Sequence, residues 1–164
     1  MDIVSTELRS VDTTDDGKGY RMQETETKLH IAFVIDERNG LMFNNRRVSM
    51  DSVLREEVLG LARAASGCVR VRPYSLTQFG EEELVQASDA PWCDAKDGDV
   101  VFVEDVDPAT IPGVSKVTLF HWNRRYPFDL VSTFDFADFE LIQTKEFAGT
   151  SHERITEETW VRMR

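Results

Sequence analysis

The sequence predicts an α/β domain built on one mixed β-sheet, mainly parallel, with antiparallel strands near the C-terminus and a few flanking helices. Two observations support this class. The first half of the chain runs strand, polar loop, helix and strand, an order that produces parallel neighbours. The last third carries several strand-like segments with short connections, and short connections join antiparallel neighbours.

The first elements follow from the spacing of apolar residues. After Lys28, the run LHIAFVI is apolar almost throughout, which predicts a central buried strand, and the turn-forming residues DERNG close it. A polar loop follows, which contains Asn44, Asn45, Arg46 and Arg47. Ser49 is placed to cap a helix over 51–65, and Gly67 marks its C-terminal end. The apolar residues that recur at helical spacing are Leu54, Val58, Leu61 and Ala65.

The remaining elements are shorter. The segment CVRVRPYS alternates apolar and basic residues, which predicts a strand that ends at Pro73. We then expect a short helix at 75–83, a short strand at 84–87, a loop at 89–98, a buried strand in DVVFVEDV and one helical turn in DPATIPG. The last strands are KVTLFHW, FELIQTKEF (within 138–147) and ITEETWVRM (155–163). A helix is the alternative for 155–163, but its alternating residues form no apolar helical stripe.

The composition limits the domain count and the partners. Residues 1–27 are polar and acidic, without a period of 2 or 3.6, so we expect a flexible tail followed by a single domain over 28–164. The formal net charge is −11, from 30 acidic and 19 basic residues, and this charge would repel an extended nucleic acid.

The sequence also bears on the compartment. It shows no signal segment, and no apolar run approaches the ~18 residues of a membrane span. Two distant cysteines without a CxxC spacing suit a reducing compartment. We therefore expect a soluble cytoplasmic protein; the sequence does not indicate its oligomeric state.

The order of these elements resembles the dihydrofolate reductase fold over roughly residues 28–164. A turn of the form Asp-x-x-x-Gly, from Asp36 to Gly40, follows the opening strand, and KVTLFHW leads through a loop to Phe134 and the last two strands. The resemblance implies that a carboxylate near the start of the first helix anchors a pterin, and Asp51 lies near that place. Asp51 is therefore a candidate catalytic residue; the alternative is a carboxylate stabilised by the helix dipole.

The residues argue against the NADPH cofactor that the same resemblance would imply. The family needs a Gly-Gly turn after a late strand, where backbone N–H groups approach a pyrophosphate. Here VVFV runs into Glu104, Asp105 and Asp107, whose carboxylates would repel phosphate. Arg47 and Val48 also replace the proline and tryptophan that usually line the first loop. We therefore expect no NADPH and predict no other cofactor.

Three stretches, GLMFNNRR, LFHWNRRYPFD and FAGTSHERITEE, resemble a small bacterial family that often carries the label ribonuclease Z. A true ribonuclease Z needs a His-x-His-x-Asp-His cluster, because its two zinc ions take several imidazoles and a bridging carboxylate. This chain has only His30, His121 and His152, and none has that spacing. We conclude that the label does not describe the chemistry of this chain, and we predict no metal site.

Two polar loops supply the candidate binding residues. If the resemblance holds, the loop after the first strand and the loop after LFHW lie side by side over a ligand cleft. Guanidinium groups there would grip a phosphate or carboxylate, and an aromatic side chain would stack on a planar ring. The alternative is that the arginines pair with the many carboxylates of the chain. The candidate binding residues are Asn44, Asn45, Arg46, Arg47, Tyr74, Trp122, Asn123, Arg124, Arg125 and Tyr126.

Histidines supply the candidate acid and base. His121 ends a strand and His152 follows Ser151 in a turn, so two imidazoles beside an arginine-bound phosphate could cleave a phosphodiester. The alternative for each is a structural hydrogen bond.

Three functions therefore stay open. The first is a small-molecule-binding protein with an anionic or nucleotide-like ligand, and the sequence leaves open whether it is an enzyme. The second is a metal-independent ribonuclease or phosphodiesterase that uses His121 and His152. The third is an acidic regulatory module that binds another protein.

Overall fold

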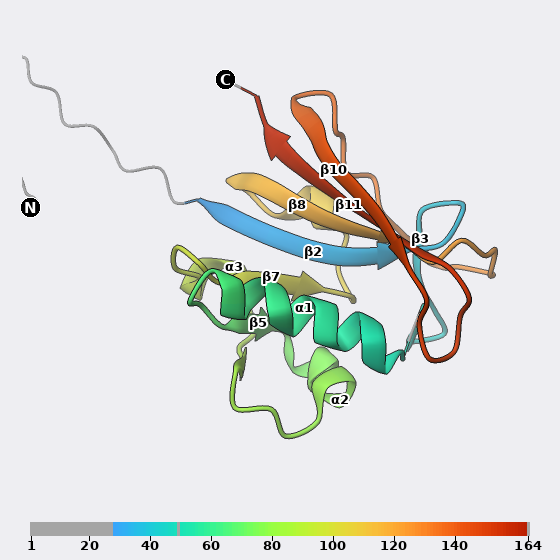
Figure 1. Ribbon diagram of the computed structural model, residues 1–164, viewed down its shortest axis with the longest axis horizontal. Coiled ribbons are helices and arrows are strands. Elements are labelled where there is room, and N and C mark those ends of the chain that lie inside the picture. The colour runs from blue at the N-terminus through green and yellow to red at the C-terminus, as the bar shows by residue number, and fades with distance from the viewer. Residues whose placement is uncertain (1–27, 49, 164) are drawn as a thin grey trace, which may run out of the picture.

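A seven-stranded mixed sheet forms the centre of the computed structural model, which describes residues 28–48 and 50–163 (Figure 1). The predicted tail, 1–27, and the predicted helix cap, Ser49, lie outside the described residues. The strand order is β10-β11-β8-β2-β7-β5-β6. The bounds are β2 Leu29–Ile35, β5 Val69–Val71, β6 Val85–Ala87, β7 Val100–Val103, β8 Val114–His121, β10 Phe139–Phe147 and β11 Ile155–Arg162.

The three apolar runs of the sequence are neighbouring strands, as predicted. Strand β2 lies between β7 and β8 and is parallel to both. Phe33, Val101 and Leu119 are 1%, 0% and 3% exposed. A strand covered on both faces is mostly apolar and does not alternate, which explains the pattern of LHIAFVI, VVFV and KVTLF. Two polar exceptions, His30 and Thr118, bond to each other.

The C-terminal strands pair antiparallel, as predicted, in the order β8, β11, β10. Strand β11 is the segment for which a helix was the alternative. Its even positions up to Trp160 are half-buried, whereas Ile155, Glu157 and Thr159 are buried. This alternation is that of a strand with two differently covered faces.

Helix α1 spans Ser52–Ala64 and crosses one face of the sheet (Figure 1). Its N-cap is Asp51, whose Oδ1 accepts hydrogen bonds from the backbone N–H groups of Val53 and Leu54. Two residues of the predicted apolar stripe do not belong to the buried face of α1: Leu61 is only half-buried and Ala65 is exposed. The buried face is Leu54, Val58, Leu59 and Ala62, which pack against the sheet.

The end of α1 depends on two residues. Ser66, not Gly67, takes the left-handed conformation, with φ of 59°. The Gly67 N–H donates to Ala62 O and the Ser66 N–H to Arg63 O, which satisfies two terminal carbonyls. Gly67 is required for a different reason: a Cβ there would lie 2.1 Å from the carbonyl oxygen of Gly98.

The predicted loop at 44–47 is instead a β-hairpin. Strand β3 (Gly40–Phe43) and β4 (Arg46–Arg47) pair antiparallel across a turn at Asn44 and Asn45. Both asparagines have positive φ, 51° and 61°, as a two-residue type I′ turn requires. Strand β3 also pairs with β9 (Leu130–Val131), so the hairpin belongs to a second, three-stranded sheet.

The connections contain four short helices. They are η1 (Pro73–Ser75), α2 (Leu76–Phe79), α3 (Pro91–Asp94) and η2 (Pro108–Thr110). The predicted helix at 75–83 is therefore shorter, and the predicted loop at 89–98 contains a helical turn that begins at a proline. The predicted strand at 84–87 and the turn in DPATIPG are confirmed.

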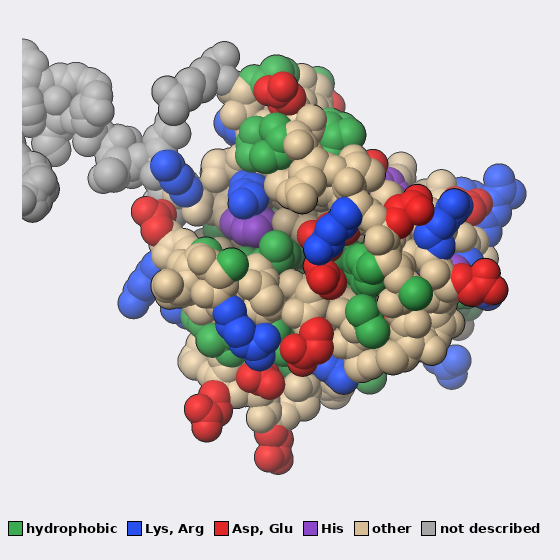
Figure 2. All heavy atoms as spheres, in the orientation of Figure 1, with side chains coloured by type: hydrophobic (Ala, Val, Ile, Leu, Met, Phe, Trp, Pro, Cys, Tyr) green, Lys and Arg blue, Asp and Glu red, His purple; other side chains and the backbone are tan. Residues whose placement is uncertain are grey.

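The surface is charged but mixed. Acidic and basic side chains are interspersed on the face that carries α1 (Figure 2). Both cysteines are free, and Cys93 is exposed. None of the helices in the described part of the chain combines the length and apolar character needed to cross a membrane.

Candidate functional site

A cleft of about 320 Å³ lies between the β3–β4 hairpin and the segment 126–128. We call it the hairpin cleft. The two segments meet at one end of the main sheet (Figure 1), and the pairing of β3 with β9 fixes the hairpin there. The lining of the cleft includes Met42, Phe43, Arg46, Tyr126, Pro127 and Phe128.

Asp36 holds the two walls of the hairpin cleft together. Its buried carboxylate accepts hydrogen bonds from the backbone N–H groups of Arg38 and Gly40 through Oδ1 and of Tyr126 through Oδ2, at 2.8, 2.8 and 3.0 Å. Gly40 completes the turn because a Cβ there would lie 2.9 Å from Cβ of Phe128. The Asp-x-x-x-Gly turn of the sequence therefore shapes this cleft.

Three aromatic side chains of the hairpin cleft face solvent. Phe43, Tyr126 and Phe128 are 39%, 37% and 36% exposed. Tyr126 is held in place, since the Trp122 Nε1–H donates to its hydroxyl oxygen at 3.1 Å. Exposed rings gathered in one concave region are typical of a binding surface.

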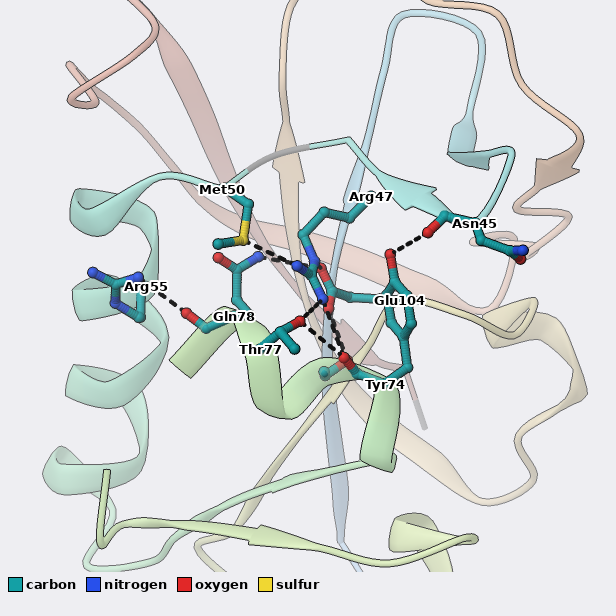
Figure 3. A network of polar contacts seen from close by, with 9 residues as sticks. Asn45, Arg47, Met50, Arg55, Tyr74, Thr77, Gln78 and Glu104 are labelled. Carbon is teal, nitrogen blue, oxygen red and sulfur yellow. Dashed lines mark hydrogen bonds and ion pairs between the residues drawn. The ribbon is translucent and has the colours of Figure 1, made fainter. Parts of the chain in front are cut away.

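Arg47 belongs to the cleft wall but is engaged by the protein (Figure 3). Its Nε donates to Glu104 Oε2 at 2.9 Å, and Nη2 donates to Tyr74 O and Thr77 Oγ1 at 3.2 and 2.8 Å. Nη1 donates to Met50 Sδ at 3.0 Å. The guanidinium also lies over the Tyr74 ring, 4.6 Å from its centroid. Arg47 therefore serves as a bridge between the hairpin and helices η1 and α2.

Glu104, directly after β7, is the buried partner of Arg47. Its Oε1 accepts from the Ser75 hydroxyl at 2.7 Å, and Oε2 also accepts from Gln78 Nε2 at 3.2 Å. Burial raises the pKa of Glu104, while Arg47, Ser75 and Gln78 act in the opposite direction. Tyr74 adds a further link, because its hydroxyl donates to Asn45 O at 2.9 Å.

Arg46 differs from Arg47. It lines the hairpin cleft, and within the described residues its exposed side chain makes no hydrogen bond or ion pair. Arg46 is thus the guanidinium that a ligand in this cleft can reach. The neighbouring Asn44 and Asn45 provide the turn rather than binding groups; the Asn44 N–H donates to Asp129 Oδ2 at 3.1 Å.

Of the candidate binding residues in the second predicted loop, only Tyr126 lines the hairpin cleft. Asn123 has a positive φ of 58° and donates through Nδ2 to Arg154 O and Thr156 Oγ1. Arg125 is exposed, with Nε 3.6 Å from Glu37 Oε1. Arg124 lines a separate pocket beside His152. The structure therefore does not bring arginines from both loops into one cleft, because Arg124 and Arg125 are not among the residues that line the hairpin cleft.

The two candidate histidines lie on opposite faces of the sheet. His121 Nε2 lies 2.9 Å from Glu158 Oε1, within a cavity that also holds Trp160. His152 accepts a hydrogen bond from Arg124 Nε at its Nδ1 and stacks on Trp122 at 4.5 Å between ring centroids. Trp122 packs in the core under α1, and successive side chains of an extended chain point to opposite faces. The structure does not join these imidazoles in one site.

The third histidine has a structural role. His30 on β2 makes a hydrogen bond to Thr118 Oγ1 at 2.8 Å. Burial, together with nearby Lys116, lowers its pKa from 6.5 to about 3, so the imidazole is neutral in the folded protein. No cluster of three His, Cys, Asp or Glu side chains within residues 28–48 and 50–163 is arranged to hold a metal ion.

Asp51 is fully buried and engaged by hydrogen bonds. Besides capping α1, it accepts from the backbone N–H and hydroxyl of Ser151 at Oδ2, at 3.0 and 3.1 Å. Burial alone would raise the pKa of Asp51, but the backbone N–H groups of Ser151, Thr150 and Leu54 outweigh burial and lower it from 3.8 to about 2. The contacts of Asp51 are those of a helix cap and loop anchor.

Comparison with solved structures identifies the architecture. The chain matches a dihydrofolate reductase from Enterococcus faecalis complexed with NADP(H) and RAB-propyl, with a TM-score of 0.57 over 85% of this chain and 98% of that chain. The chain has the dihydrofolate reductase fold. The predicted fold resemblance is thereby confirmed. At 12% identity the match to that dihydrofolate reductase extends to the fold alone. Comparisons of the sequence with protein-family models and with curated proteins found no match.

Within the dihydrofolate reductase fold, the sequence reasoning did not mark three residues as candidates: Asp36 and Phe128, which line the hairpin cleft, and Glu104, which holds its wall through Arg47. Asp36 was visible only as part of a turn motif, and Glu104 only as a charge that would repel phosphate. Phe128 follows Tyr126 and Pro127, and no periodicity of the sequence predicts that its side chain is exposed. Gly40 was the one available signal for Phe128. A glycine that closes a turn often allows another segment to approach its backbone closely, and here that segment carries Phe128.

Proposed function

We propose that this chain binds a small organic anion with a planar or apolar body in the hairpin cleft. The observation that carries the proposal is the combination of three exposed aromatic side chains with the exposed guanidinium of Arg46 in one cavity. The rings suit the body of the ligand, and the guanidinium fork suits a phosphate or carboxylate. A mononucleotide has both parts.

The surrounding contacts support the division of roles between the two arginines. Arg47 gives its donors to Glu104, Tyr74 and Thr77, so it sets the position of β4. Arg46 precedes it on the same two-residue strand and keeps its donors free of partners in the described residues. A rigid hairpin that presents one free guanidinium loses little side-chain entropy elsewhere on binding.

The proposal is tested by calorimetric titration with adenosine 5′-monophosphate and with adenosine, which lacks the phosphate. We expect the monophosphate to bind at least about tenfold more tightly, because a charge-assisted contact is worth roughly 1.5–3 kcal/mol. Arg46→Gln should reduce the monophosphate to the affinity of adenosine. Arg63→Gln, an exposed arginine on α1, is the matched control and should change nothing.

Equal affinities for the two compounds, or an unchanged affinity in Arg46→Gln, would contradict the proposal. Native mass spectrometry of the gently purified protein provides a second readout that needs no chosen probe. A retained species that contains a phosphate or carboxylate supports the proposal, and a retained neutral compound opposes it.

We also propose that NADPH is not a ligand of this chain. The support is the buried Glu104 at the end of β7, where the reductase resemblance expects glycines. Its carboxylate accepts hydrogen bonds from Arg47, Ser75 and Gln78, and a carboxylate would repel a phosphate. Saturable micromolar binding of NADPH in the same calorimeter would overturn this proposal.

The hydrolytic alternative is not favoured. It needs His121 and His152 beside one phosphate, and the two imidazoles lie on opposite faces of the sheet. The third alternative, an acidic protein-binding module, lacks a specific contact that would name its partner.

A further inference from the structure

A second cavity, of about 240 Å³, lies on the sheet face that does not carry α1. We call it the aromatic cavity. Its floor is formed by side chains of three adjacent strands, since Leu119 on β8 is paired with Phe33 on β2 and with Glu158 on β11. The segment 132–136 covers the floor with Phe134 and Phe136.

Aromatic rings form a continuous wall around this cavity. The centroid distances are 6.2 Å for Phe33 and Phe134, 4.7 Å for Phe134 and Phe136, and 4.6 Å for Phe136 and Trp160. A chain of rings in contact positions each ring with little freedom. The wall is therefore formed before any ligand arrives.

One carboxylate stands at the edge of this apolar surface. Glu158 is mostly buried, and its Oε1 accepts from Trp160 Nε1 at 3.0 Å. His121 Nε2 lies 2.9 Å from the same oxygen but makes no aligned hydrogen bond, within the described residues. Oε2 makes no hydrogen bond in the part of the chain that the structure describes. A carboxylate carries about four acceptor sites, so Glu158 retains acceptor capacity.

We propose that the aromatic cavity binds a small organic ammonium ion with an aromatic or apolar body. The ammonium group would donate to Glu158, and the body would lie among Phe134, Phe136 and Trp160. Aromatic faces attract cations, and a chain of net charge −11 draws cations toward its surface. The aromatic cavity shares no lining residue with the hairpin cleft, so this proposal is independent of the proposed function.

The test compares 2-phenylethylamine with 2-phenylethanol, a neutral analogue of nearly the same shape. Both are titrated into the full chain, and the indole N–H signal of Trp160, assigned with Trp160→Phe, is followed by NMR. We expect the amine to shift this signal saturably and the alcohol to bind at least about tenfold more weakly. Glu158→Gln should lower the amine affinity by a similar factor. Glu140→Gln, an exposed glutamate on β10, is the control and should leave it unchanged.

Two results would overturn the proposal. One is equal binding of amine and alcohol to the wild-type chain, a comparison that needs no variant to fold. The other is no saturable shift of the Trp160 indole signal with amine up to about 10 mM, which corresponds to a binding free energy too small for a built site.

Discussion

Arg47 on the β3–β4 hairpin and the buried Glu104, directly after β7, form an ion pair with 2.9 Å between Nε and Oε2. The pair links two elements that are far apart in sequence and belong to different sheets. It fixes the hairpin that presents Arg46 and Phe43 to the hairpin cleft. Stability of this pair and ligand binding are therefore expected to be connected.

Arg47→Ala should destabilise the protein by roughly 3–5 kcal/mol, because it leaves the Glu104 carboxylate buried without its cation. Glu104→Gln in the same background should recover part of this loss, since Gln78 and Ser75 can still bond to a neutral amide. Urea unfolding of the two single variants and the double variant measures this coupling. Strictly additive losses would show that the pair contributes nothing specific.

Asp51→Asn tests the anchor between α1 and the 149–151 loop. The folded pKa of Asp51 is about 2 and its ordinary value is 3.8, so the unfolded chain binds the proton first as the pH falls. The stabilisation by this carboxylate should thus be complete above about pH 4 and be lost between pH 4 and 2. The variant should be less stable by about 2 kcal/mol at pH 7 and lack this acid-dependent loss. Asp97→Asn, in an exposed loop, should behave as the wild type in the same urea titrations.

Glu157 on β11 should make stability depend on pH in the direction opposite to Asp51. It faces Glu57 on α1, and Lys145 Nζ lies 3.0 Å from Glu57 Oε2 and 3.9 Å from Glu157 Oε1. Burial and the nearby Glu57 raise the pKa of Glu157 from 4.5 to about 8, against the influence of Lys145. The unfolded chain releases this proton near pH 4.5 while the folded chain keeps it.

This contribution to stability should consequently be complete below about pH 4.5 and decline until about pH 8. Glu157→Gln should flatten that part of the stability profile and raise stability at pH 8. Glu140→Gln should leave the profile as it is. An identical slope in Glu157→Gln and the wild type, measured by urea unfolding between pH 5 and 8, would show that the proton is not retained.

Gly60, inside α1, and Gly67, just beyond its C-terminal end, should respond in opposite directions to alanine. A Cβ at Gly60 meets no atom within 4 Å, so Gly60→Ala should stabilise the helix by about 0.5–1 kcal/mol. A Cβ at Gly67 would meet backbone atoms of Gly98 and Asp99, so Gly67→Ala should lower the melting temperature. Thermal unfolding of both variants measures these effects. A melting temperature of Gly67→Ala equal to that of the wild type would show that the backbone at residues 67 and 98 can separate at little cost.

The large elements could be predicted because burial on both faces leaves a sequence pattern. LHIAFVI and KVTLF are mostly apolar without alternation, and β11 alternates because its two faces have different surroundings. The hairpin was missed because its signal, Asn44 and Asn45 with positive φ, resembles a polar loop when the flanking strands are only four and two residues long.

The candidate site was predicted only in part, for a related reason. Arg46, Arg47 and Tyr126 do line one cleft, whereas Arg124 lines another pocket and Arg125 pairs with Glu37. Which way a loop arginine points is decided by partners distant in sequence, such as Glu104 for Arg47 and His152 for Arg124. Local sequence cannot reveal such partners, and the same holds for the separation of His121 and His152 by the sheet.

The most direct test of the proposed function is a map of backbone amide shifts on titration with adenosine 5′-monophosphate. We predict saturable shifts confined to the hairpin at 40–48 and to the segment 126–128, and their disappearance in Arg46→Gln but not in Arg63→Gln. Shifts centred on residues 123–124 and 152–154, or shifts that persist in Arg46→Gln, would place the anion elsewhere and contradict the account.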